Sequence, residues 1–414
     1  METIAGLLTA GRYSAALSLL RSGANTDSFS GAEREVVLAE LLQKTGNAGA
    51  AQNRVRRLLR TAGLADSLRV RCLGVMVEEL RDLADIEAGI SCLQRAWNLA
   101  RNGKSDDRAC WIGLPLMLAL FEGPGPEAAL GFLPSVRNAV VRAGDPLATA
   151  ALHVFVAELE AKRGLVSNAA EHLRVGRRLL AQHSNAWLEG SAAVGAACVS
   201  FLLSDMGTAR TEALLGLRLA EQSGHLGVKR AALANLGHID LAEGAFGKAE
   251  EILREALHLS PPASEAQKGI VDGLAQVALA EGNSPEADRL LRTLPEWTPE
   301  TPRGSWYYGL WSCVTRSRLL AMGGRYKEAR DLLAAAVTGA EGQPDTILAS
   351  SLRLLQAEAL VRTGRRSRAV GVVAEAAAQA GPAPMDTLAE VNRVAAIALA
   401  AGGDLAGAGT AFER

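Results

Sequence analysis

The sequence has few aromatic residues and no excess of charge of either sign. Aromatic side chains make up 4% of the 414 residues, and 44 lysines and arginines balance 45 aspartates and glutamates. A nucleic-acid-binding domain usually carries a basic excess, and a polyanion mimic an acidic one. The balance favours neither class, so we do not expect this chain to bind nucleic acid. The arginines between Arg54 and Arg60 are spread around a predicted helix and indicate a solvated face.

Cysteine and long apolar runs are equally scarce. The five cysteines form no C-x-x-C motif, and their odd number argues against a disulfide framework. They predict buried, reduced thiols in a cytosolic protein. Residues 1–20 have neither a positively charged leader nor a small-residue cleavage site, and no apolar run reaches the ~18–20 residues of a membrane helix. We therefore expect a soluble, cytoplasmic protein without a membrane partner. The cysteines are Cys72, Cys92, Cys110, Cys198 and Cys313.

Motifs that carry catalytic chemistry are missing as well. The sequence has no G-x-x-x-x-G-K-[ST] phosphate loop and no H-E-x-x-H zinc motif, and its six histidines show no metal-ligand spacing. We therefore predict no catalytic, cofactor-binding or metal-binding residues and do not expect an enzyme.

The composition is dominated by alanine, leucine and arginine, which are all good helix formers. Within it, one short sequence pattern recurs along the chain. An apolar helical end is followed by a small residue and, five positions later, by a second small residue. Eight copies are clear: Gly11/Ala16, Gly46/Ala51, Gly164/Ala169, Gly244/Ala249, Gly282/Ala287, Gly324/Ala329, Gly364/Ala369 and Gly403/Ala408. Three weaker copies fill the gaps: Ala84/Gly89, Gly123/Ala128 and Gly207/Ala213.

The second small residues recur at intervals of 35 to 44 residues along the whole chain. A period near forty is typical of stacked helical pairs. Each glycine is expected to end a first helix in the left-handed conformation, and each second small residue is expected where two helices cross closely. The pattern predicts an all-α fold, a right-handed α-solenoid of about eleven helix-turn-helix repeats in a single array over residues 1–414.

Residues 230–263 resemble a tetratricopeptide repeat along their full length, and residues 310–343 come close. The positions that match in the first segment are Leu233, Leu236, Gly237, Gly244, Phe246, Ala249, Leu253, Ala256 and Pro261. The longer spacing of the other copies is similar to the helical-repeat regions of large bacterial transcription activators of the maltose-regulon type. The eleventh copy stops about one turn after Ala408 without a polar capping helix, so we expect an amino-terminal piece of a longer protein with an output domain beyond it.

The resemblance implies that the first helix of each pair faces a concave groove. Side chains at fixed distances before the second small residue of each copy are expected to reach into this groove. Mixed charge at these positions suits a protein or peptide better than a phosphate backbone. The predicted partner-binding residues are Glu78, Arg81, Glu158, His238, Asp272, Gln276, Trp311, Arg318, Glu358 and Arg362, with Glu40, Lys44, Asp82 and Lys162 at equivalent positions.

Aromatic residues concentrate in one segment, where Trp297, Trp306, Tyr307, Tyr308 and Trp311 supply five of the 17 aromatics. Tryptophan and tyrosine are enriched where proteins bind partners. Three prolines in the preceding stretch predict an irregular loop over residues 294–305. We add Trp306 and Tyr307 to the predicted partner-binding residues, although packing between repeats would explain this segment equally well.

These observations predict a protein- or peptide-binding scaffold, the sensor or regulatory region of a bacterial signalling or transcription regulator. Two alternatives stay open. One is a scaffold subunit that docks and restrains an effector enzyme such as a caspase-like protease. The other is a receptor for small peptides of the quorum-sensing type.

Overall fold

The computed structural model describes residues 2–23, 29–82, 86–103, 105–262, 264–298, 306–341, 346–380 and 385–413. Within them the chain forms 22 helices, which pair in chain order, and no strand. The first helices of the pairs are α1 (Ile4–Thr9), α3 (Gly31–Lys44), α5 (Asp66–Asp82), α7 (Asp106–Glu122), α9 (Pro146–Lys162), α11 (Ala186–Leu202), α13 (Leu226–Ala242), α15 (Glu265–Ala280), α17 (Trp306–Met322), α19 (Thr346–Arg362) and α21 (Met385–Gly402). The second helices are α2 (Tyr13–Arg21), α4 (Ala48–Leu59), α6 (Ile86–Asn102), α8 (Pro126–Ala143), α10 (Val166–Leu180), α12 (Met206–Ser223), α14 (Phe246–His258), α16 (Ser284–Leu291), α18 (Tyr326–Glu341), α20 (Arg366–Ala380) and α22 (Leu405–Glu413).

The recurring sequence pattern marks these pairs correctly. All eight glycines of the clear copies have positive φ, between 66° and 93°, and stand between the two helices of a pair. The second small residue lies in the second helix in all eleven copies, and it is buried in nine of them. The prediction of an α-solenoid with eleven helical pairs is therefore confirmed.

Two weaker copies were placed wrongly in detail. Gly207 does not end a helix but lies in the first turn of α12, and Ser204 takes the left-handed conformation, with a φ of 61°. In the other copy Gly125, not Gly123, has positive φ, and α8 begins directly after it with a proline at residue 126. Its buried small residue is accordingly Ala129.

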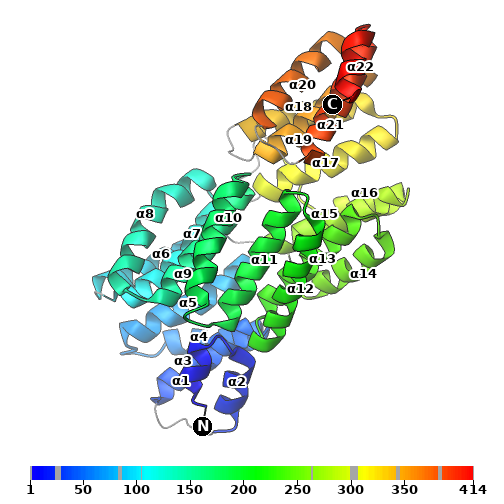
Figure 1. The fold of residues 1–414 in the computed structure, drawn as a ribbon. Helices are drawn as coiled ribbons and strands as arrows, with labels where there is room; N and C mark the ends of the chain where they lie inside the picture. The colour runs from blue at the N-terminus through cyan, green and yellow to red at the C-terminus, as the bar shows by residue number, and fades with distance from the viewer. Residues whose placement is uncertain are drawn as a thin grey trace.

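Successive pairs pack against each other through the whole chain, and the array coils in space (Figure 1). Buried apolar residues from neighbouring pairs form the cores, because each pair alone would leave one apolar face uncovered. None of the helices in the described ranges combines the length and the apolarity that a membrane span requires.

The coiling brings the first pair of helices against the middle of the array. Helix α2 contacts α12, and the backbone amide of Ala186 donates a hydrogen bond of 2.9 Å to the carbonyl of Ala10. The Asn185 side-chain amide donates another, also of 2.9 Å, to the carbonyl of Thr9. In an open solenoid each repeat contacts only its neighbours, so this contact closes the amino-terminal half of the array on itself.

Candidate functional site

The closed turn of the array surrounds a cavity of about 2100 Å³. Most of its lining comes from the first helices of the pairs, from α3 to α15, with Tyr308 of α17. Helices α1 and α2 contribute Leu8, Thr9 and Tyr13 at the amino-terminal side. The inward orientation of the first helices agrees with the tetratricopeptide resemblance.

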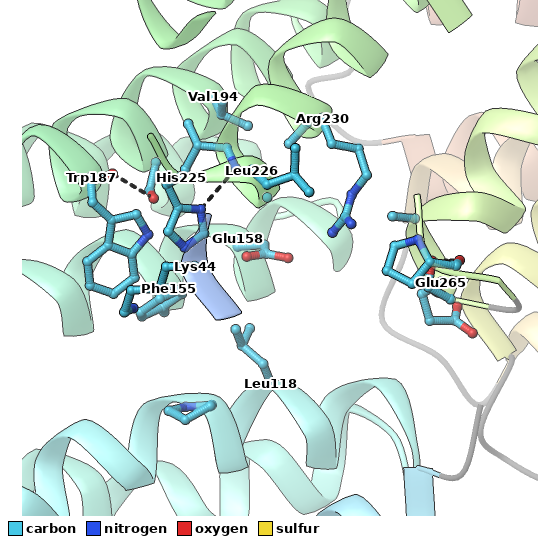
Figure 2. Close-up of a pocket in the computed structure, with 18 of the residues that line it drawn as sticks. Lys44, Leu118, Phe155, Glu158, Trp187, Val194, His225, Leu226, Arg230 and Glu265 are labelled. Carbon is cyan, nitrogen blue, oxygen red and sulfur yellow. Dashed lines mark hydrogen bonds between the residues drawn. The ribbon is translucent and has the colours of Figure 1, made fainter. Parts of the chain in front are cut away.

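An aromatic cluster around Trp187 forms one wall of the cavity (Figure 2). The Trp187 ring stacks on His225 with a centroid distance of 5.6 Å and an interplanar angle of 20°. Tyr13 lies 6.1 Å from Trp187 and 6.0 Å from His225. Trp111 and Phe155 lie 6.2 Å and 6.4 Å from Trp187. The cluster therefore joins the first helical pair to four pairs from the middle of the array, those that begin with α7, α9, α11 and α13.

Lys44 adds a cation to this cluster. Its Nζ lies 4.7 Å from the centre of the Tyr13 ring and 4.4 Å from that of Trp187, within the ~6 Å of a cation–π interaction. Burial lowers the pKa of His225 well below the ordinary histidine value, and the nearby charges of Lys44 and Arg230 lower it further. His225 is therefore neutral at physiological pH, and its Nδ1 accepts a hydrogen bond from the Val228 amide at 3.2 Å.

Ion pairs line the remaining walls. Lys162 of α9 donates a hydrogen bond of 2.8 Å to Glu158 and lies 4.0 Å from Glu122 of α7. Burial alone would lower the pKa of Lys162, but these two carboxylates outweigh it and raise the pKa above the ordinary lysine value. The side chain is therefore firmly charged. Two further pairs, Arg71 with Glu40 and Lys268 with Glu265, complete the set.

Arg230 extends from α13 toward the open middle of the cavity, between Glu158 and Glu265 (Figure 2). Leu118 of α7 faces it from the opposite wall. A molecule in the cavity would thus meet an aromatic wall on one side and alternating charges on the other.

The structure brings only part of the predicted partner-binding set to this cavity. Glu158 and His238 line it, as do Glu40, Lys44 and Lys162. The backbones of Glu78, Arg81 and Asp82 lie in α5, but their side chains are outside the described residues.

The other predicted residues lie outside the cavity lining. Asp272 is buried in α15, where its Oδ2 accepts a hydrogen bond of 2.8 Å from Gln276. Arg318 is exposed on α17. Glu358 pairs with Arg393, and Arg362 lies 5.7 Å from the Tyr326 ring centre.

The aromatic residues between Trp297 and Trp311 have two different locations: some pack between helices, and one lines the cavity. Atoms of Trp297 lie so close to Gly309 and Gly339 that a Cβ on Gly339 would come within 2.2 Å of the ring. Tyr307 and Trp311 pack against the central core, whereas Tyr308 lines the cavity. The Trp306 side chain lies outside the described residues. Of the predicted loop, residues 294–298 carry no helix and residues 299–305 are outside the description.

The residues that define the aromatic wall, above all Trp187, His225 and Tyr13, were not among those predicted from the sequence. They are single residues in separate repeats, and no local pattern connects them. The only signal was that Tyr13 occupies the aromatic position of its copy of the sequence pattern, two residues after Gly11. No group of three or more His, Cys, Asp or Glu among the residues that the structure covers is arranged to hold a metal ion.

The fold is a tetratricopeptide-like array of helical pairs that coils around a large cavity. Residues 240–305 match the tetratricopeptide repeat family. No curated protein matches the chain by sequence.

The chain is similar to several solved structures at low sequence identity. A Rap protein complexed with Competence and Sporulation Factor has a TM-score of 0.61 at 10% identity, over 84% of this chain and 96% of that one. Yeast Tom70 gives a TM-score of 0.39 at 13% identity, over 97% of this chain and 87% of that one. A signal transduction ATPase with a tetratricopeptide repeat sensor from Pyrococcus horikoshii gives 0.42 at 14% identity, over 94% of this chain and 53% of that one.

Proposed function

We propose that the chain binds a peptide, or an extended segment of a protein, inside the cavity. The observation that carries this proposal is the size and lining of the cavity. Its volume of about 2100 Å³ is more than twice the ~300–1000 Å³ of a typical small-molecule pocket. A chain of several residues fits this space better than a single metabolite.

The size of the cavity favours a peptide receptor over a scaffold that docks a folded effector. A few peptide residues fit into about 2100 Å³ beside the aromatic wall, whereas a folded domain such as a caspase-like protease is far larger than this space. The Rap protein of similar fold, whose structure contains Competence and Sporulation Factor, also supports the receptor hypothesis. A sensor or regulatory region of a bacterial signalling or transcription regulator is the setting we propose, with the output on another domain or protein.

The lining suggests how such a peptide is recognised. Large apolar side chains of the peptide would pack against Trp187, Phe155 and Leu118. This contact is favourable because it removes the apolar surface of both partners from water. Polar groups and the peptide backbone would meet Arg230, Glu158 and Glu265 on the other side (Figure 2). Because both kinds of charge are present, a mixed sequence is favoured over a strongly acidic or basic one.

Selection from a phage-displayed random peptide library, followed by calorimetry with the selected peptides, tests this proposal. The diagnostic variant is Ala231→Trp, which fills the cavity from α13, where Ala231 is a lining residue. Its matched control is Leu214→Trp on the 45% exposed Leu214 of α12. We expect Ala231→Trp to weaken binding at least about a hundredfold, the effect of removing one hot-spot contact of ~2–3 kcal/mol, and the control to bind like the wild type. Equal binding by both variants, or no selected peptide, would overturn the proposal.

A further inference from the structure

We propose that the contact between the first helical pairs and the middle of the array is a clasp that opens to admit the ligand and closes over it. The clasp consists of Thr9, Ala10, Tyr13 and Lys44 on one side and Asn185, Ala186, Trp187 and His225 on the other. The inference rests on the proposed function, because it assigns regulation to the same cavity.

The clasp forms part of the cavity wall. Thr9, Tyr13 and Lys44 line the cavity from the amino-terminal side, and Asn185, Trp187 and His225 line it from the middle of the array. Separating the two sides therefore widens the opening of the cavity. The movement breaks no covalent bond, and it parts the Tyr13 ring from the rings of Trp187 and His225.

The fit between the two sides is close. A Cβ on Gly224, which has a φ of +73°, would lie 1.8 Å from the Oγ of Ser14, and a Cβ on Gly11 would lie 2.4 Å from Oδ1 of Asn185. Side chains larger than hydrogen at these glycines would hold the two sides apart. Both glycines also have positive φ, because they follow helices, and their lack of a side chain lets the two sides come this close.

The clasp is nevertheless narrow compared with the cores that flank it. The amino-terminal core, built from residues between Ile4 and Val75, and the central core are separate clusters of buried residues. Of the residues that the structure describes in the middle of the array, Trp187 alone packs against both. Regions held by few buried apolar contacts open at lower free energy than cores, so the clasp is the joint at which this array separates.

A disulfide across the same junction tests the clasp. A Cβ on Gly46 would lie 3.7 Å from the Cβ of Leu226, within the ~3.5–4.5 Å found in disulfides. The double variant Gly46→Cys, Leu226→Cys should lock the clasp when oxidised and release it when reduced. A cysteine at residue 46 must adopt a φ of +93°, which is strained for a residue with a side chain. Thermal unfolding of the oxidised and reduced forms is therefore recorded first, to establish that both are folded.

The native Cys198 reports access to the cavity without any ligand. It lines the cavity and is half-buried, whereas the other four cysteines are buried. We expect oxidation of the lock to slow labelling of Cys198 by fluorescein maleimide at least about tenfold, because the opening step is removed, and reduction to restore the wild-type rate. Peptide mapping by mass spectrometry separates Cys198 from the introduced thiols. The variant Trp187→Leu, which loosens the clasp, should speed the same reaction.

Each outcome separates the clasp from the peptide proposal. If the locked and unlocked forms label Cys198 at equal rates, and Trp187→Leu does not change the rate, the clasp is wrong. If selected peptides bind the wild type while the oxidised lock associates with them as fast as the reduced form, the clasp fails and the peptide proposal stands. If no peptide binds the wild type but the Cys198 rates differ as expected, the clasp stands and the proposed function fails.

Discussion

At the residue scale, partial or complete burial shifts the pKa values of several titratable side chains. Burial lowers the pKa of His238 to about 4 and lowers those of His153 and His172, whose Nδ1 atoms lie 2.9 Å apart. Burial acts in the opposite direction on Asp272, where it raises the pKa to about 6. Histidines and this aspartate therefore make opposite contributions to the pH dependence of stability.

The histidines should make the protein sensitive to acid. In the folded state His238 binds a proton only near pH 4, whereas the unfolded chain binds one near the ordinary value of 6.5. The unfolded state thus holds more protons in this window, and stability present above pH 6.5 is lost as the pH falls toward 4, by up to ~3 kcal/mol. Urea unfolding across this range should show a smaller loss for His238→Gln than for the wild type. Parallel curves for the two proteins would contradict this.

Asp272 predicts the reverse dependence. Its pKa is raised from 3.8 in the unfolded chain to about 6 in the folded state, so its contribution is fully present below pH 3.8 and is lost as the pH rises through 6. The neutral variant Asp272→Asn keeps a partner for Gln276 and avoids burying a charge. We expect its stability relative to the wild type to increase by up to ~3 kcal/mol between pH 4 and pH 7. A difference that does not change with pH would show that Asp272 is solvated in the folded protein.

At the element scale, glycines within helices have two different roles. A Cβ on Gly237 of α13 would lie 2.6 Å from Cγ of Leu253 in α14, whereas a Cβ on Gly131 of α8 meets nothing within 4 Å. We expect Gly237→Ala to destabilise the protein by ~1–3 kcal/mol because the helices must separate. Gly131→Ala should instead stabilise it by ~0.5–1 kcal/mol through helix propensity. Thermal unfolding of the two variants is the measurement, and effects of the same sign would contradict the close crossing of α13 and α14.

The same element scale explains why the sequence predicted the helical pairs so well. Gly244, Phe246 and Ala249 lie within six residues, so the turn and the close crossing leave a local signal that recurs in every repeat. The two errors arose where a residue other than the predicted glycine has positive φ in the turn: Ser204 instead of Gly207, and Gly125 instead of Gly123. Ser204 lies three residues before the predicted Gly207, and Gly125 lies two residues after the predicted Gly123.

At the scale of the whole molecule, the sequence could not predict the closure of the array. Tyr13 and His225 are 212 positions apart, and their contact depends on the accumulated twist of the pairs between them. Small rotations per repeat determine that path, and no single residue specifies them. For the same reason the predicted groove residues Arg318, Glu358 and Arg362 follow the repeat pattern correctly but lie beyond the turn that encloses the cavity.

Closure should couple distant parts of the chain, and hydrogen exchange can detect the coupling. The amide of Ala186 donates to the carbonyl of Ala10 across the clasp, so its protection depends on the first helical pair. We expect Tyr13→Leu, which removes the ring contacts with Trp187 and His225, to accelerate exchange at Ala186 by about tenfold, the effect of losing ~1.4 kcal/mol of local stability.

The matched control is Tyr326→Leu, because Tyr326 holds the same position in its copy of the sequence pattern, two residues after Gly324, but lies outside the clasp. Exchange at Ala186 should be unchanged in this variant. An open solenoid, in which repeats contact only their neighbours, would give no response at Ala186 to either substitution. A response to Tyr13→Leu alone would therefore show that the first repeat and the middle of the array open and close together, as the proposed clasp requires.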